Sequence, residues 1–329
     1  MLGVMLRVLS GMRPTGRLHI GHLSVLENWR ELQEKHRCFF FVADLHALTT
    51  AFDRTEEIKG NTREMVLDWL AVGLDPEKSV LFVQSRVLET AQLHLLFSMI
   101  VPLGWLYRVP TYKDQVQQFR EKGKDIMTYG FLGYPVLMSA DILLYRAEGV
   151  PVGEDQLPHL ELCRELARRF NHLYRPVFPE PQAILARIPV LPGVDGRKMS
   201  KSYANDIPIM AEPEEIWRRV NAMITDPARI HKTDPGHPEV CVVHKYHRIY
   251  TSRRLAEIEE DCRAGRVGCV PCKKLLAGSL EALLAPVRER RKELEAKPGF
   301  VEEVLREGTR RAREEASETL GLVREAMGI

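Results

Sequence analysis

Hydrophobic and polar positions in the first third of the chain alternate in a way that predicts strands separated by helices. Short apolar runs, rich in β-branched and aromatic residues, predict strands at residues 6–9, 39–43 and 80–83. Apolar positions recur at helical spacing over residues 23–35 and 55–72, and the second stretch ends at Gly73 as a helix C-cap does. This alternation indicates βαβ units and a parallel sheet, with ligands at the carboxyl ends of its strands.

The remainder of the chain becomes progressively more helical. Helices are predicted at residues 89–101, 137–145 and 154–170, a short strand at 149–153, and a proline- and glycine-rich loop at 178–196. Beyond residue 213 the pattern is almost entirely helical, over 214–224, 252–263, 272–296 and 300–327. We therefore predict a Rossmann-like doubly wound parallel sheet with a C-terminal all-helical domain. The predicted divisions are residues 1–205, 206–299, and a C-terminal helix at 300–329 that can pack back on the first domain.

Composition limits the classes of protein that remain. The 329 residues are 45% hydrophobic, enough for a full core and two domains. The net charge is only +2, so any contact with nucleic acid must come from a local basic patch. Arg7 and Ser10 interrupt the apolar N-terminal segment, so neither a signal peptide nor a membrane span is expected, and a cytoplasmic protein follows.

Two short strings suggest a site for a triphosphate. His19-Ile20-Gly21-His22 follows a strand and a turn at residues 11–16 and opens a helix, where backbone N–H groups and the helix dipole favour anions. Lys198-Met199-Ser200-Lys201-Ser202 follows a glycine-containing approach at 193–196, as a mobile cationic clamp would require. Histidine caps and an ordinary solvated basic loop are the structural alternatives.

The six cysteines are unevenly distributed. Cys38 and Cys163 lie in apolar patterns typical of inert core thiols. The remaining four fall within 32 residues, and in a cytoplasmic chain such clustering favours a metal over disulfides. Four thiolates suit either tetrahedral zinc or an iron–sulfur cluster, and their spacing does not choose between the two. These four are Cys241, Cys262, Cys269 and Cys272.

The two strings, together with residues 11–16, 134–138, 140–145 and 150–156, resemble the class I aminoacyl-tRNA synthetases, and within that class the tryptophanyl-tRNA synthetase family. The resemblance covers nearly the whole chain. The cysteine array resembles the subset with a 4Fe–4S cluster in the anticodon-binding domain, with Zn²⁺ as the alternative.

The resemblance implies how ATP would be held. His19 and His22 would bind the ATP phosphates, while Lys198 and Lys201, with Mg²⁺, would stabilise charge on the departing pyrophosphate. Further ATP contacts are implied for Arg13, Pro14, Thr15, Gly21, Gly153, Glu154, Asp155, Ile188, Met199, Ser200 and Ser202. Arg13 departs from the family pattern, because many relatives have glutamine there.

A second set of residues is implied to bind tryptophan. Asp141 would accept the indole N–H, an arrangement that leaves the acceptor unpaired when phenylalanine competes. Leu9 replaces an aromatic residue that many relatives have beside the indole. The other members of the set are Met138, Val150 and Val152 around the ring, Tyr134 and Gln156 at the amino group, and His46 as part of the pocket structure.

These expectations amount to a tryptophan–tRNA ligase. The predicted partners are L-tryptophan, tRNA(Trp) and a second copy of the chain in a homodimer, and no membrane. A tyrosine–tRNA ligase and a non-catalytic RNA-binding paralogue are the alternatives. The first shares the fold and both strings, whereas the second has no need of His19, His22, Lys198 or Lys201.

Overall fold

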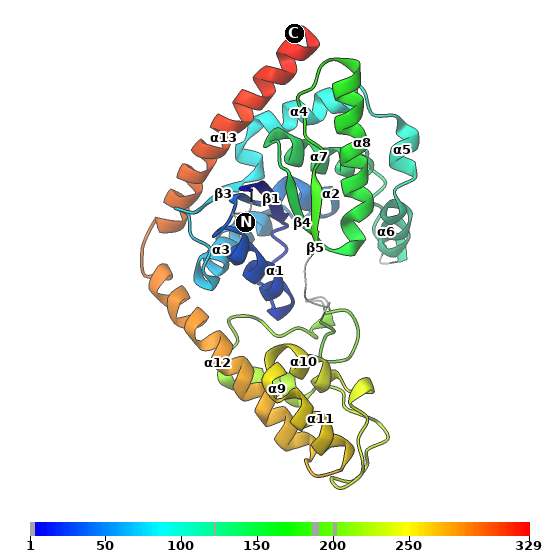
Figure 1. The fold of residues 1–329 in the computed structure, drawn as a ribbon, viewed down its shortest axis with the longest axis vertical. Coiled ribbons are helices and arrows are strands. Elements are labelled where there is room, and N and C mark those ends of the chain that lie inside the picture. Colours follow the sequence, from blue (N-terminus) through cyan, green and yellow to red (C-terminus); the bar gives the residue numbers. More distant parts are fainter. Residues whose placement is uncertain (1–3, 122, 186–190, 200–202) are drawn as a thin grey trace. The chain divides into compact units, whose positions relative to one another are not determined.

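The computed structural model describes residues 4–121, 123–185, 191–199 and 203–329. The chain forms two compact units, which are treated separately below (Figure 1). The first comprises Met1–Gly16, Asn28–Ala186 and Lys297–Ile329, and the second comprises Arg17–Glu27 and Arg187–Ala296. Among the described residues, no helix has the length and apolar character needed to cross a bilayer.

A five-stranded parallel sheet forms the centre of the first unit, which confirms the predicted fold class. The strands lie in the order β3-β2-β1-β4-β5. Their bounds are Arg7–Met12 for β1, Arg37–Val42 for β2, Ser79–Val83 for β3, Gly149–Val152 for β4 and Gln182–Leu185 for β5. The prediction was wrong for β5, which lies in the stretch expected to be a loop and pairs with β4.

Alternate residues of β2 face opposite sides of the sheet and build two apolar layers. On one side, Phe40 stacks on Trp29 at 4.4 Å between ring centroids, and Trp69 meets that indole edge-on at 5.3 Å. On the other side, Phe39 packs against Tyr145 at 4.9 Å. The sheet is therefore covered on both faces, as parallel sheets require.

Helices of the first unit surround this sheet. The helix α3 is confirmed in full, ending at Gly73 with φ of 115° as the glycine C-cap predicts. By contrast, α7 begins eight residues before the predicted start, because Thr128 caps it by accepting a hydrogen bond from the Phe131 N–H at 3.1 Å. The helices are α2 (Asp44–Ala51), α3 (Glu56–Val72), α4 (Leu88–Ser98), α5 (Leu103–Tyr107), α6 (Pro110–Glu121), α7 (Tyr129–Leu144), α8 (Leu157–Leu173) and α13 (Phe300–Met327).

The C-terminal helix α13 packs against β3 and α4. Gly308 makes this close approach possible, since a β-carbon there would overlap the Leu81 carbonyl oxygen. Glu315 adds ion pairs to Arg7, at 2.9 Å, and to Arg37. The predicted helix at 300–327 is thus confirmed, and it belongs to the unit that holds the sheet.

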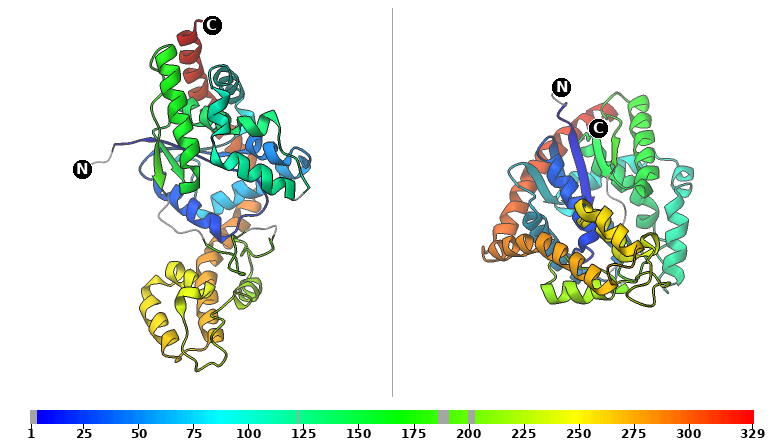
Figure 2. Two further views of the ribbon diagram at one scale, coloured as in Figure 1. Left: turned by 90° about the vertical axis from the view of Figure 1, so that its right-hand side faces the viewer. Right: turned by 60° about the horizontal axis from the view of Figure 1, so that its bottom comes forward.

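The second unit is mainly helical, and Figure 2 shows its helices from two further sides. The long helix α12 (Cys269–Glu295) packs against α9 (Pro213–Asn221) and α10 (Val242–Tyr250), and α11 (Leu255–Arg263) completes the group. Arg288 of α12 is buried and donates to the Ala211 carbonyl at 2.8 Å. The first residues of α1 (Ile20–Leu32) also belong to this unit.

Candidate active site

The sheet of the first unit has a topological switch point between β1 and β4. These strands are neighbours, although each continues to a different side of the sheet, and α/β proteins bind ligands at such a point. The turn after β1 contains Gly16 at φ 105°, with the Thr15 N–H donating to the Arg13 carbonyl at 2.8 Å. After β4, a β-carbon on Gly153 would lie 2.7 Å from Asp155 Oδ1. The predicted ATP-contacting segments 13–15 and 153–155 therefore follow these two adjacent strands.

Asp141 is a buried carboxylate on α7, with 3% of its surface exposed. Gln84 Nε2 donates to both of its oxygens, at 2.8 and 2.9 Å, and His46 Nε2 lies 2.8 Å from Oδ2. A carboxylate offers roughly four acceptor positions, so these contacts leave room for one further donor. The arrangement can accept an N–H from a ligand while remaining hydrogen-bonded without it.

Burial dominates the electrostatics of this carboxylate. Desolvation raises the pKa of Asp141, and the hydrogen bonds from His46 and Gln84 oppose that shift. Desolvation also lowers the pKa of the neighbouring His94. The site therefore disfavours charge, and an N–H donor that reaches Asp141 meets little competition from solvent.

The apolar residues predicted around an indole ring lie close to this carboxylate's helix. Leu9 and Val150 belong to the buried cluster that fills this side of the sheet, and Met138 and Val152 pack against it. Leu9 and Val150 come from the adjacent strands β1 and β4. The structure thus brings the four predicted residues into one apolar environment.

Two predicted contacts to the amino group have partners within the protein. Tyr134 Oη lies 2.8 Å from Nε2 of the buried His159, and Gln156 Nε2 donates to Asp155 Oδ2 at 2.8 Å. The sequence analysis missed His159 and Gln84. Gln84 could have been predicted from the sequence, because a polar residue directly after the apolar strand β3 lies at the ligand-binding edge of the sheet. His159 lies within a helical pattern and has no such feature.

The second unit holds both of the strings that suggest a triphosphate site. The rings of His19 and His22 lie 3.9 Å apart between centroids. The Gly21 N–H donates to His19 Nδ1 and the His19 N–H donates to His22 Nδ1, each at 3.2 Å. Because Nδ1 is the acceptor in both rings, the proton of each neutral imidazole is assigned to Nε2. The start of α1 therefore presents imidazole N–H donors suited to phosphate oxygens.

Backbone pairing ties this string to the segment after the lysine string. The Ile20 N–H donates to the Ile207 carbonyl at 2.9 Å, and the Ile209 N–H donates to the Leu18 carbonyl at 3.1 Å. A β-carbon on Gly21 would lie 3.0 Å from the His19 ring and 3.4 Å from Met199 Sδ. A glycine is thus needed where the two strings approach each other.

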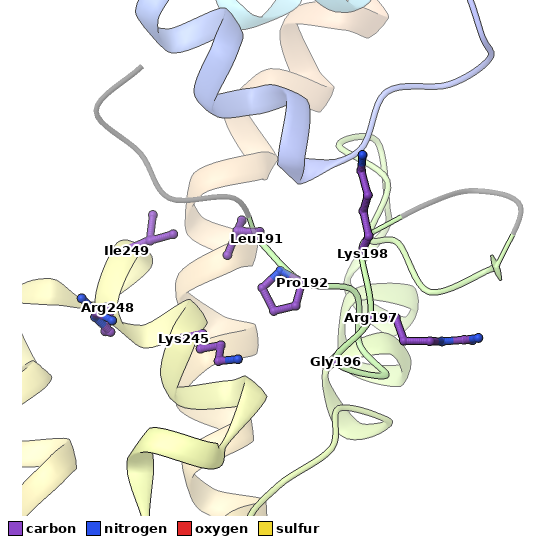
Figure 3. A pocket seen from close by; sticks show the side chains of 8 residues that line it. All are labelled: Leu191, Pro192, Gly196, Arg197, Lys198, Lys245, Arg248 and Ile249. Carbon is purple, nitrogen blue, oxygen red and sulfur yellow. The ribbon is translucent and has the colours of Figure 1, made fainter. Parts of the chain in front are cut away.

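The approach to the lysine string is a hairpin organised by Asn205. This buried side chain donates to Asp195 Oδ1 at 2.8 Å and to the Lys198 carbonyl at 3.2 Å. The hydrogen bond from Asn205 lowers the pKa of Asp195. Lys198 is exposed, and its side chain points toward the start of α1 (Figure 3). The predicted contacts Ile188, Ser200, Lys201 and Ser202 lie outside the described residues.

The four clustered cysteines also lie in the second unit. Burial, followed by the charges of the other three thiols, raises the pKa of Cys272 to about 12. The thiols therefore lie within electrostatic range of one another. No three histidine, cysteine or acidic side chains of the described part of the chain are placed to hold a metal ion.

One cation lies beside these thiols. Burial raises the pKa of Cys262, and the positive charge of Arg229, whose Nη1 approaches Cys262 Sγ at 3.8 Å, opposes that shift without cancelling it. A β-carbon on Gly236 would lie 2.6 Å from the same sulfur, so the backbone leaves space there. Four soft donors with a nearby cation are a set that zinc or an iron–sulfur cluster can use.

The parallel sheet, the switch point and the paired histidine and lysine strings define a class I synthetase. The chain belongs to the family of class I tRNA synthetases (W and Y), whose sequence model matches residues 3–285. It is 54% identical to the tryptophan–tRNA ligase of Thermotoga maritima, over 98% of this chain and 99% of that one. It is 48% identical to the tryptophan–tRNA ligase of Aquifex aeolicus, over 98% of this chain and 100% of that one.

A solved structure shares the same architecture. The tryptophanyl-tRNA synthetase of Campylobacter jejuni, in its complex with ADP and tryptophan, superposes with a TM-score of 0.87 at 34% identity. The comparison covers 98% of this chain and 100% of that one. The predicted fold and family are therefore confirmed over nearly the full length.

Proposed function

We propose that this chain is a tryptophan–tRNA ligase, which activates L-tryptophan with ATP and then transfers it to tRNA(Trp). The observation that carries the choice of amino acid is Asp141, a buried acceptor held by His46 and Gln84 beside a large apolar cluster. An indole offers one N–H donor on an otherwise apolar ring, which matches that environment. The full-length relatives named tryptophan–tRNA ligase support the same conclusion.

In the first step, a carboxylate oxygen of tryptophan attacks the α-phosphorus of ATP, which enters as its Mg²⁺ complex. The bond from that phosphorus to the bridging oxygen breaks, and pyrophosphate leaves with the electron pair. His19 and His22 would donate hydrogen bonds from Nε2 to phosphate oxygens as negative charge develops on these oxygens. Lys198 and Lys201 would stabilise the leaving pyrophosphate, with no covalent bond to the protein.

In the second step, a ribose hydroxyl at the 3′ end of the tRNA attacks the carbonyl carbon of tryptophanyl-adenylate. The hydroxyl proton is lost, and AMP departs with the electrons of the acyl–phosphate bond. Tyr134 and Gln156 would hold the amino group of tryptophan during both steps, so that the reacting carboxyl carbon keeps its position.

Pyrophosphate exchange tests this proposal directly. Exchange of labelled pyrophosphate into ATP should depend on tryptophan, with tyrosine and phenylalanine weaker by several orders of magnitude. A preference for tyrosine would instead identify the tyrosine enzyme. Absence of exchange with any amino acid, alongside intact RNA binding, would identify a non-catalytic paralogue.

We also propose that Cys241, Cys262, Cys269 and Cys272 hold a 4Fe–4S cluster, with Zn²⁺ as the alternative. Four thiols in mutual electrostatic range, with Arg229 beside one of them, support a thiolate-bound centre. When bound, either group would cross-link α10, α11 and α12 and so brace the helical unit. Iron, sulfide and zinc analysis of protein purified without oxygen distinguishes the two, and only the cluster gives broad visible absorption.

A homodimer is the proposed assembly, as family resemblance implies. Its support within this chain is a group of exposed apolar side chains on α4 and α5, which a second copy would cover. Light scattering should give twice the monomer mass, and Met99→Glu should shift it toward the monomer. The exposed residues are Leu88, Leu95, Met99, Leu103 and Tyr107.

A further inference from the structure

The second unit contains a pocket of about 370 Å³ between α10 and the hairpin that leads to the lysine string. One wall carries Lys245, Arg248 and Ile249, which share a face of α10 because they are spaced by three and four residues. The opposite wall includes Pro192 and Lys198. Figure 3 shows Lys245 extending from the helix toward the hairpin.

The cations of α10 have no acidic partner in the part of the chain that the structure describes. Lys245 and Arg248 are exposed, and no carboxylate there lies within ion-pair distance of either. Other basic side chains of this unit differ, because His244 Nε2 lies 2.7 Å from Glu259 Oε1 and Arg263 pairs with Glu239. The pocket therefore keeps positive charge that intramolecular pairs do not neutralise.

The hairpin side of the pocket is tied to α10 by a hydrogen bond and contributes the apolar Leu191 and Pro192. Tyr246 Oη donates to the Pro192 carbonyl at 2.6 Å, which fixes the wall to α10 itself. Arg197 also lies at the pocket, but it pairs with Asp195 at 2.6 Å and points away from the opening (Figure 3). A ligand there would meet Lys245 and Arg248 on one side, and the apolar Pro192 together with Lys198 on the other.

We propose that this pocket binds the backbone of the RNA substrate, with Lys245 and Arg248 on a phosphodiester and Pro192 and Ile249 against the adjoining nucleoside. This inference rests on the proposed tRNA-charging function. Since the net charge of the whole chain is only +2, RNA affinity must come from local patches, and this one combines unpaired cations with an apolar surface. Because Lys198 lines the same pocket, RNA bound there would lie next to the lysine string.

The test is the double variant Lys245→Ala/Arg248→Ala, with Arg253→Ala as the matched control. Arg253 is also an exposed cation of this unit, but it does not line the pocket. At about 0.1 M salt the double variant should bind tRNA about tenfold more weakly. The slope of log Kd against log salt concentration should be smaller by about one to two than in the native protein. The charge-conserving variant Lys245→Arg/Arg248→Lys should restore both values, and the control should change neither by more than about twofold.

Tryptophan-dependent pyrophosphate exchange, measured without tRNA, separates this inference from the proposed function. The double variant should exchange within about twofold of the native rate, since no step of amino-acid activation needs RNA. Unchanged tRNA affinity and salt slope would overturn the pocket assignment while leaving the ligase intact. A loss of exchange with unaltered tRNA binding would also overturn it, because the cations would then serve ATP. Absence of exchange in the native protein would instead refute the proposed function.

Discussion

Replacing Asp141 by asparagine would remove a buried charge while keeping the side-chain volume and one acceptor oxygen. A hydrogen bond to a charged group is worth about 1.5–3 kcal/mol, against about 0.5–1.5 kcal/mol between neutral groups. If the indole N–H donates to Asp141, the variant should lose about 1–2 kcal/mol of transition-state stabilisation. That loss corresponds to a fall in kcat/KM for tryptophan of about 5- to 30-fold in pyrophosphate exchange.

The stability of the same variant, relative to the native protein, should depend on pH. Burial raises the pKa of Asp141, so the native state holds this proton more tightly than the unfolded chain, where the pKa is about 3.9. Above about pH 4 the carboxyl ionises in the unfolded chain while the native one still holds its proton, so its contribution to stability falls as pH rises. Asparagine has no such titration. The difference in Tm, variant minus native, should therefore grow more positive from about pH 4 toward pH 7.

Asp44→Asn is the matched control for both measurements. Asp44 follows β2 and accepts from the Leu45 and Ser85 N–H groups, each at 3.0 Å, outside the apolar cluster around Asp141. It should leave tryptophan kcat/KM within about twofold of the native value. Native-like tryptophan kcat/KM in the Asp141 variant would refute the acceptor role. A Tm difference that does not become more positive toward neutral pH would refute the claim that burial raises the pKa of this carboxyl.

Four further substitutions have defined outcomes. Gly308→Ala places a methyl group on the Leu81 carbonyl and should lower the free energy of unfolding by about 1–3 kcal/mol in thermal unfolding. Gly321→Ala on the same helix meets open space and should raise that free energy by up to about 1 kcal/mol. Gly21→Ala should raise KM for ATP and lower kcat, each by about tenfold, at unchanged Tm, because the added carbon displaces the imidazole beside it. Cys272→Ser should abolish the bound iron or zinc in metal analysis and lower the Tm of the helical unit; full metal retention would remove this cysteine from the ligand set.

Local patterns predicted most of the sheet and the long helices. The runs that became β2 and β3 are apolar enough to be recognised alone, and α13 matches its predicted bounds at both ends. The pattern failed where tertiary contacts decide the outcome. For example, β5 has only four residues in a proline-rich stretch, and its order comes from pairing with β4. Similarly, the helix predicted from residue 137 begins at Tyr129 and continues through Pro135, with Ser139 Oγ donating to the Pro135 carbonyl at 2.9 Å.

The candidate site shows the same division between local and non-local information. The placement of His19 and His22 at a helix start was predictable because the string creates that geometry by itself, and their role in binding phosphate stays a prediction. The partners of Asp141 were not predictable, because His46, Gln84 and Asp141 are separated by 38 and 57 residues and meet only where α2 packs against α7 and against the segment after β3.

A buried acceptor needs those partners for a physical reason. Without His46 and Gln84 the desolvated carboxylate of Asp141 would hold its proton and offer a hydroxyl rather than two anionic oxygens. The two donors counter that shift and fix the orientation of the carboxylate before a ligand arrives. Discrimination between tryptophan and phenylalanine therefore depends on the whole group of three, and a change at Gln84 should weaken it even though Gln84 need not touch the substrate.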